Sequence, residues 1–184
     1  MTPFTYHRPT SLDEAVTALQ QGPQPAVVLA GGTDLLVRYK LEGSHFGAVV
    51  SLRDIDGLDR IDADDDAVTL GARVTLAEVL ESDLLADRVP LLVDAARRMA
   101  NTNIRNRATV MGNICNASPA ADTAGPLLVL GAQVAVVGPD GERWVDMGDW
   151  FTGPRQCCLA DGEIARALRI PNQTGAGRYE RLAN

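Results

Sequence analysis

Two glycine-containing segments have the residue types of turns that bind phosphate through the backbone. The first is Gly-Gly-Thr-Asp at residues 31–34, between an apolar run at residues 26–30 and a mixed run at residues 35–40. Adjacent glycines permit positive φ angles and let a ligand approach the main chain with no Cβ in the way. The N–H groups of residues 32–34 would then converge on one anion beside a helix N-terminus. The alternative is an ordinary turn in which Asp34 caps the helix.

The second segment is Thr-Val-Met-Gly-Asn at residues 109–113, in which a glycine and a side-chain amide follow a short apolar run. Ser118 and Asp122 lie downstream, and an Asp after such a loop can accept hydrogen bonds from ribose or ribityl hydroxyls. Two structural alternatives stay open. In one, the asparagine amides satisfy the backbone of their own loop. In the other, Asp122 caps a helix that begins near Thr123.

The negative net charge of the chain limits the ways in which it could bind a phosphate group. The chain of 184 residues carries a formal charge of −7, which argues against a nucleic-acid partner because phosphate backbones need a positive face. A cofactor phosphate therefore cannot rely on a basic patch and has to be met by backbone N–H groups. The first segment is also neither a Rossmann fingerprint nor a P-loop, because the glycine and lysine spacing of those motifs is missing.

The pattern around the first segment predicts a small N-terminal α/β lobe over residues 1–56. Residues 11–14 (Ser-Leu-Asp-Glu) form a capping box that opens a helix ending near Gln21. The apolar runs at residues 26–30 and 47–52 are typical of buried strands. Strands that alternate with helices in this way indicate a βαβ-like unit.

From residue 57 to residue 178 the pattern indicates a second, larger α+β lobe with a mainly antiparallel sheet. The predicted elements are, in order, a hairpin of residues 59–61 and 67–70, a helix opened by a capping box at Thr75 and Glu78, helices at residues 90–99 and 125–130, a hairpin of residues 133–137 and 141–145 with an Asp-Gly turn, and a strand at residues 165–170. The overall fold class is therefore expected to be α+β.

The stretch of residues 101–122 has no clear period, and it contains five asparagines among small residues. A loop of this length inside a compact domain is usually functional or disordered. Disorder favours charged and proline-rich runs, which this stretch is not. We therefore expect an ordered binding loop.

The remaining polar and aromatic residues favour structural roles. Cys115, Cys157 and Cys158 form neither a disulfide framework nor a zinc site, and reduced thiols are typical of a cytoplasmic protein. The N-terminal residues lack the apolar core of a signal peptide, and no apolar run approaches the about 20 residues of a membrane helix. His7 and His45 are isolated, and Trp144 and Trp150 are expected in the core or between the lobes.

Taken in order, these segments resemble the flavin subunit of the molybdenum hydroxylases, the family of carbon monoxide dehydrogenase and xanthine dehydrogenase. The resemblance covers essentially the whole chain and rests on an ordered set of motifs rather than on one. The motifs are Tyr-His-Arg-Pro at residues 6–9, Ser-Leu-Asp-Glu-Ala at 11–15, Ala-Gly-Gly-Thr-Asp-Leu-Leu at 30–36, the stretch 104–122, Glu-Ile at 163–164, Ile-Pro at 170–171 and Tyr-Glu-Arg at 179–181. It implies FAD between the two lobes, in a fold of the vanillyl-alcohol-oxidase type.

The resemblance also implies which residues bind FAD. The first loop would wrap the pyrophosphate with Leu29, Ala30, Gly31, Gly32, Thr33, Asp34 and Leu35, and the second would complete the cradle with Thr109, Val110, Met111, Gly112 and Asn113. Ser118 and Asp122 match positions that contact the sugar and ribityl portion. Ala165 matches a position where the chain meets the flavin ring, and Arg181 lies near a position that usually holds lysine.

Two features depart from the family pattern. The second loop of the family usually reads Thr-Ile-Gly-Gly-Asn, whereas Met111 replaces its first glycine here and would narrow the pocket or mark a subfamily. Family members also continue into a C-terminal domain, so residues 179–184 are expected to be the start of a domain that is missing from this sequence.

The function implied by the resemblance is electron transfer. Electrons from a molybdenum-cofactor subunit would pass through an iron–sulfur subunit to FAD and then to an external acceptor. The flavin carries the redox chemistry, so no catalytic acid or base of the protein is expected. One alternative is a self-contained flavin oxidoreductase of the same fold class. The other is a flavin-free docking module, which Met111 and the missing C-terminal region favour.

Overall fold

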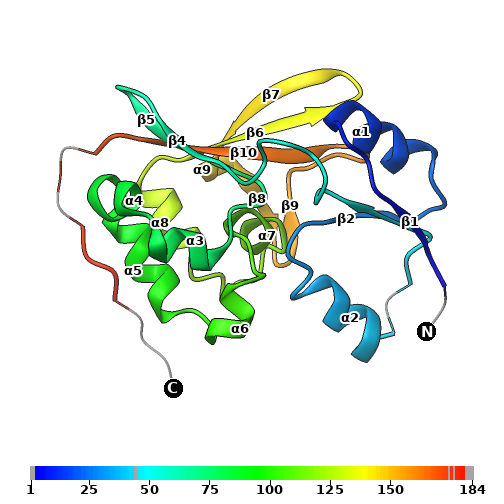
Figure 1. Ribbon diagram of the computed structural model, residues 1–184, viewed down its shortest axis with the longest axis horizontal. Helices are drawn as coiled ribbons and strands as arrows, with labels where there is room; N and C mark the ends of the chain where they lie inside the picture. The colour runs from blue at the N-terminus through cyan, green and yellow to red at the C-terminus, as the bar shows by residue number, and fades with distance from the viewer. Residues whose placement is uncertain (1–2, 44, 174, 176, 181–184) are drawn as a thin grey trace.

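The computed structural model describes residues 3–43, 45–173, 175 and 177–180, and these residues form two main sheets. A three-stranded parallel sheet comes from the first part of the chain, and a five-stranded antiparallel sheet comes from the rest. Figure 1 shows the large sheet running along one side of the molecule, with most of the helices gathered beneath it and the small sheet beside it.

The small sheet has the strand order β1-β3-β2, with all strands parallel. Its elements are β1 (Thr5–His7), α1 (Leu12–Gln21), β2 (Ala26–Leu29), α2 (Leu35–Leu41) and β3 (Ala48–Ser51). The predicted cap of α1 is confirmed at Ser11, whose side chain accepts from the N–H of Glu14 (3.2 Å). Glu14 in turn accepts from the N–H of Thr10 (2.8 Å). The central strand β3 is fully buried, as its mainly apolar sequence predicts.

The large sheet has the order β4-β5-β10-β6-β7, and every neighbouring pair is antiparallel. The strands are β4 (Ile61–Ala63), β5 (Ala67–Gly71), β6 (Gln133–Gly138), β7 (Gly141–Asp146) and β10 (Ile164–Pro171). Both predicted hairpins are confirmed. The last strand of the chain lies in the middle of the sheet, where Leu168 pairs with Leu70 on one side and Val134 on the other.

The helices of this part of the chain are short. They are α3 (Leu76–Glu81), α4 (Asp83–Arg88), α5 (Pro90–Arg98), α6 (Thr102–Arg105), α7 (Val110–Cys115), α8 (Ala124–Val129) and α9 (Met147–Trp150), and α9 leads into the hairpin of β8 (Phe151–Gly153) and β9 (Gln156–Cys157). The predicted capping box at Thr75 and Glu78 is complete. Within the described part of the chain, none of these helices combines the length and apolarity needed to span a bilayer.

The expectation that residues 101–122 form only a loop is wrong, because this stretch contains α6 and α7. Asn101 and Thr109 cap the two helices, accepting from the N–H groups of Ile104 (3.0 Å) and Gly112 (2.9 Å). Helices of four and six residues are too short to show a helical period. Their Asn and Thr caps are residue types that are also typical of turns.

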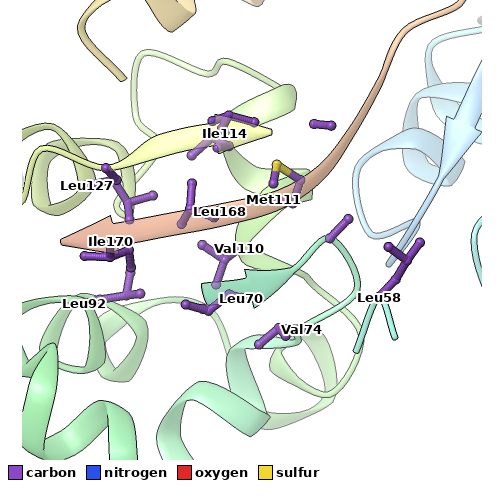
Figure 2. Close-up of a cluster of buried hydrophobic side chains, with 14 of the residues drawn as sticks. Leu58, Leu70, Val74, Leu92, Val110, Met111, Ile114, Leu127, Leu168 and Ile170 are labelled. Atoms are coloured by element: carbon purple, nitrogen blue, oxygen red, sulfur yellow. The ribbon is translucent and has the colours of Figure 1, made fainter. Parts of the chain in front are cut away.

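One hydrophobic core joins α7 to the large sheet. Figure 2 shows the labelled side chains of this core on both sides of β10, including Val110, Met111 and Ile114 from α7 with Leu168 from β10. Trp150 is fully buried and donates its indole N–H to the carbonyl of Ile114 (3.1 Å). Trp144 does not lie in the core, which was one of its two expected places: this side chain is 46% exposed on the edge strand β7.

Shortening a buried side chain at the centre of the large sheet tests this packing. Leu168 is 1% exposed, so Leu168→Ala leaves a cavity and should lower the free energy of unfolding by about 2–5 kcal/mol. Val129→Ala is the control, because Val129 is 77% exposed and its truncation should cost less than about 0.5 kcal/mol. Urea denaturation measures both. Equal losses in the two variants would contradict the placement of β10 in the core.

Candidate functional site

A pocket of about 350 Å³ lies where the end of β2, the start of α7 and the start of β10 meet. Its volume falls within the roughly 300–1,000 Å³ of small-molecule sites. The pocket brings together both loops that the sequence singled out. The predicted residues that line it are residues 29–35 of the first loop, Thr109, Met111, Gly112 and Asn113 of the second loop, and Ala165 of β10.

The first loop depends on its two glycines for different reasons. Gly31 lies directly on the backbone before the second loop, where an added Cβ would collide with the carbonyl oxygen of Arg107. Gly32 has a φ of +77°, a conformation that residues with a Cβ rarely adopt. Gly31 therefore allows the main chains of the two loops to come into contact. Gly32 allows the chain to change direction before α2 begins.

The N–H groups of the first loop face no internal acceptor. Among the described residues, none accepts a hydrogen bond from the backbone N–H groups of residues 31–35. The helical bonds of α2 begin with the N–H of Leu36, which donates to the carbonyl of Gly32 (3.1 Å). Successive unpaired N–H groups form a concave site for an anion. The alternative in which Asp34 caps α2 is not realised, because Asp34 makes no capping hydrogen bond.

The second loop is fixed from behind by the segment that leads into α3. The N–H of Val110 donates to the carbonyl of Val74 (3.1 Å), and the N–H of Leu76 donates to the carbonyl of Ala108 (2.8 Å). Thr109 is buried and caps α7. This support holds the start of α7 against the pocket.

Two asparagine side chains present polar atoms to the pocket. The hydroxyl of Thr123 donates to Oδ1 of Asn113 (2.6 Å), and this leaves the Nδ2 donors of Asn113 without an acceptor in the described part of the chain. Asn116 also lines the pocket, and its Oδ1 is buried with no hydrogen-bond partner. A buried polar atom without a partner costs free energy, so both side chains suit a polar ligand.

Four predicted residues lie elsewhere. Val110 packs in the core behind the pocket and contributes no side chain to the lining. Ser118 accepts from the N–H of Ala120 (3.3 Å). Asp122 accepts from the hydroxyl of Tyr179 (2.9 Å) and does not cap α8, whose N-cap position is Thr123. Arg181 lies outside the described residues.

Two charged residues of the pocket, Arg38 and Glu163, were not predicted as site residues, although Glu163 belongs to one of the motifs of the resemblance. The Arg143 guanidinium donates two hydrogen bonds to Glu163 (2.8 and 2.7 Å) and lowers the pKa of its carboxyl group. Glu163 follows a turn directly before β10, and no spacing in the sequence marks it. Arg38 lies one helical turn after Asp34, and this i, i+4 spacing of opposite charges could have predicted an ion pair at the start of the helix.

A thiol also borders the pocket. Cys115 lies at the end of α7, and burial raises the pKa of its thiol well above the ordinary range. Burial likewise raises the pKa of Cys157. A protonated thiol is a poor nucleophile, so Cys115 serves as a packing residue, as expected from the small residues around it.

The chain belongs to the family of FAD-binding domains in molybdopterin dehydrogenases, whose pattern matches residues 2–173. It is 34% identical over 170 residues to the xanthine dehydrogenase FAD-binding subunit of Escherichia coli O157:H7, which covers 92% of this chain and 58% of that subunit. It is 35% identical over 181 residues to the carbon monoxide dehydrogenase medium chain of Afipia carboxidovorans, which covers 97% and 63%. The chain thus spans about three fifths of the length of these relatives.

Solved structures agree with this assignment. The CO dehydrogenase of Oligotropha carboxidovorans superposes with a TM-score of 0.90 at 33% identity, over 94% of this chain and 60% of that one. Quinoline 2-oxidoreductase from Pseudomonas putida 86 superposes with a TM-score of 0.90 at 28% identity, over the same shares. The mixed fold with its antiparallel sheet is therefore that of the FAD domain of these enzymes, and the resemblance inferred from the sequence is confirmed.

The residues present fit FAD. A row of unpaired N–H groups at residues 31–35 suits a pyrophosphate, which would otherwise need a basic patch. The positive φ of Gly32 and the unpartnered Oδ1 of Asn116 are the other features that a bound dinucleotide would explain. Among the described residues, no group of His, Cys, Asp and Glu is arranged to hold a metal ion.

We expect Gly32→Val to abolish FAD retention while the protein still folds. Gly32 has a φ of +77°, and a valine there would turn the loop and withdraw its N–H groups from the pocket. Gly57→Val is the matched control, because Gly57 has a φ of +82° with open space around it, outside the pocket lining. Flavin absorbance after gel filtration measures retention. Full occupancy in Gly32→Val would contradict the role of this loop.

Proposed function

We propose that the chain is the FAD-binding part of an electron-transfer flavoprotein subunit in a molybdenum-containing hydroxylase or dehydrogenase. Electrons from iron–sulfur clusters would enter at FAD and leave to an external acceptor. The observation that carries the proposal is the row of unpaired N–H groups at residues 31–35, in a loop that lines the same pocket as Asn113, in a chain of this family. Bound FAD supplies the redox chemistry, and the residues of the chain bind and orient it.

Each part of the pocket has a proposed role. The N–H groups of residues 31–35 hold the pyrophosphate, and Asn113 donates from Nδ2 beside them. Ala165 lies 5% exposed in the lining, where a small side chain leaves room for the flat face of the flavin ring. Ser118 and Asp122 are proposed to contact the sugar and ribityl portion, and Arg181 to contribute from beyond the described residues.

We further propose that the two sheets correspond to two lobes of a vanillyl-alcohol-oxidase-type fold, residues 1–56 and residues 57–178. The parallel sheet uses residues 5–51 and the antiparallel sheet residues 61–171, and the pocket is lined from both. Residues 179–184 would lead into a further domain, in agreement with the greater length of the relatives.

The proposed partners are an iron–sulfur subunit and a molybdenum-cofactor subunit of the same complex. The support is the naming of relatives as a medium chain and as an FAD-binding subunit. A cytoplasmic location agrees with the three free thiols of the chain. The negative charge of −7 gives no support to a nucleic-acid partner.

Two experiments test this function. The 184-residue chain is incubated with FAD, desalted and examined for flavin absorbance, which we expect at close to one equivalent. A chain that never takes up flavin would be the docking module instead. Co-expression with candidate iron–sulfur and molybdenum subunits should then give a complex whose substrate reduces the bound flavin. Substrate turnover by this chain alone would identify a self-contained flavin oxidoreductase.

Retention of FAD should depend on the rest of the subunit. The chain covers 58% of one relative and 63% of another, and we propose that the rest of such a subunit adds contacts to the cofactor. More contacts in the bound state slow dissociation. We therefore expect FAD to leave the 184-residue chain faster during dialysis than it leaves a chain extended by the C-terminal domain of a relative. Equal rates of loss would contradict this expectation.

The proposed role of Asp122 can be separated from its bond to Tyr179. Asp122→Asn weakens a charged acceptor and should reduce FAD affinity about ten-fold, or about 1–2 kcal/mol. Tyr179→Phe is the control, because it removes the 2.9 Å hydrogen bond and keeps the carboxylate. Isothermal titration with FAD measures both variants. If Asp122→Asn binds FAD normally and both variants only lower the melting temperature, Asp122 holds the C-terminal segment and no cofactor hydroxyl.

A further inference from the structure

The first loop contains an acid beside its anion-binding N–H groups. Asp34 belongs to the row of residues 31–35 whose N–H groups have no acceptor in the described part of the chain, and it lines the same pocket. A carboxylate at this place repels a pyrophosphate unless its charge is balanced. The protein as a whole does not balance it, since the formal net charge is −7.

Two arginines from different elements meet this carboxylate. Arg38 of α2 places Nε 2.9 Å from Oδ2 of Asp34. Arg155 places Nη1 4.0 Å from Oδ1 of the same side chain. The two guanidinium groups and the Asp34 carboxylate sum to a charge of +1, with Arg38 in the pocket lining and Arg155 beside it. The other carboxylate of the lining, Glu163, is paired with Arg143. A sequence with so few basic residues thus concentrates positive charge where the unpaired N–H groups are.

The position of Arg155 is imposed by the fold. Arg155 lies in the tight turn between β8 and β9, with a φ of +57° that is unusual for a residue other than glycine. Its N–H donates to the carbonyl of Ala117 (2.8 Å), directly after α7. The turn is therefore tied to the helix that carries the second loop, while its guanidinium reaches the first loop. A strained residue that joins two parts of a site points to function.

We propose that Arg38 and Arg155 bind the pyrophosphate of the dinucleotide, and that Asp34 orients both guanidinium groups toward it. The proposal rests on the function proposed above and adds a charged component to the backbone cradle. Guanidinium groups pair with phosphate oxygens in two parallel hydrogen bonds, and an arginine that approaches a carboxylate on one side keeps donors free on the other. The ion pair leaves Nε of Arg38 buried without a hydrogen-bond partner among the described residues. Both side chains are partly exposed, at 35% and 53%, so a ligand can reach them.

The test compares FAD with riboflavin, which carries the same ring and lacks the pyrophosphate. Arg155→Gln and Arg38→Gln in the 184-residue chain should each weaken FAD binding about ten-fold and leave riboflavin binding unchanged. FAD binding by these variants should also fall less steeply as salt rises, because a screened charge contact is gone. Arg97→Gln is the matched control, since Arg97 forms a similar exposed ion pair with Asp94 (3.6 Å) on α5, outside the pocket lining.

Arg155→Lys keeps the charge and loses the two parallel hydrogen bonds, so its FAD affinity should lie between those of the parent chain and Arg155→Gln, and melting of the FAD-free proteins verifies the fold of every variant. FAD binding equal to that of the parent chain in both glutamine variants would overturn the proposal and leave the FAD function intact. Equal losses for FAD and riboflavin would also overturn it, because the arginines would then act on the shape of the pocket. Failure of the parent chain to bind any flavin would instead refute the proposed function.

Discussion

The close contact between Gly31 and the backbone at Arg107 is the constraint on which the rest of the site depends. A Cβ at residue 31 would collide with the Arg107 carbonyl, so the two loops can share a pocket only while that position is glycine. The contact joins the end of β2, which belongs to the small parallel sheet, to the segment that starts α7. Since α7 packs its apolar side chains on β10, the contact also ties the pocket to the core of the large sheet.

This arrangement determines which parts of the pocket are formed by main-chain atoms and which by side chains. The close contact of the two loops brings main-chain atoms to the pocket, and the N–H groups of residues 31–35 have no acceptor in the described part of the chain. The bonds between the start of α7 and the β5–α3 segment keep the other wall of the pocket in place. Met111 is 4% exposed and extends from this wall into both the core and the pocket lining.

Local signals in the sequence predicted most elements near the site. The capping residues Ser11 and Thr75, the apolar run before Gly31 and the Asp-Gly hairpin each depend on neighbours within a few residues, and each prediction is confirmed. Long-range features could not be predicted in this way. Nothing local indicates that β10 pairs between β5 and β6, or that Arg155 lies 4.0 Å from Asp34. The short helices α6 and α7 were missed because four or six residues show no period.

Amide hydrogen exchange with and without FAD tests the central claim most directly. The N–H groups of residues 31–35 have no acceptor in the described part of the free protein, so they should exchange fast there and become strongly protected when the pyrophosphate accepts from them. The N–H of Gly112, which already donates to Thr109 (2.9 Å), should change much less. FAD binding with unchanged exchange at residues 31–35 would contradict the account, because the cofactor would then be held somewhere other than this loop.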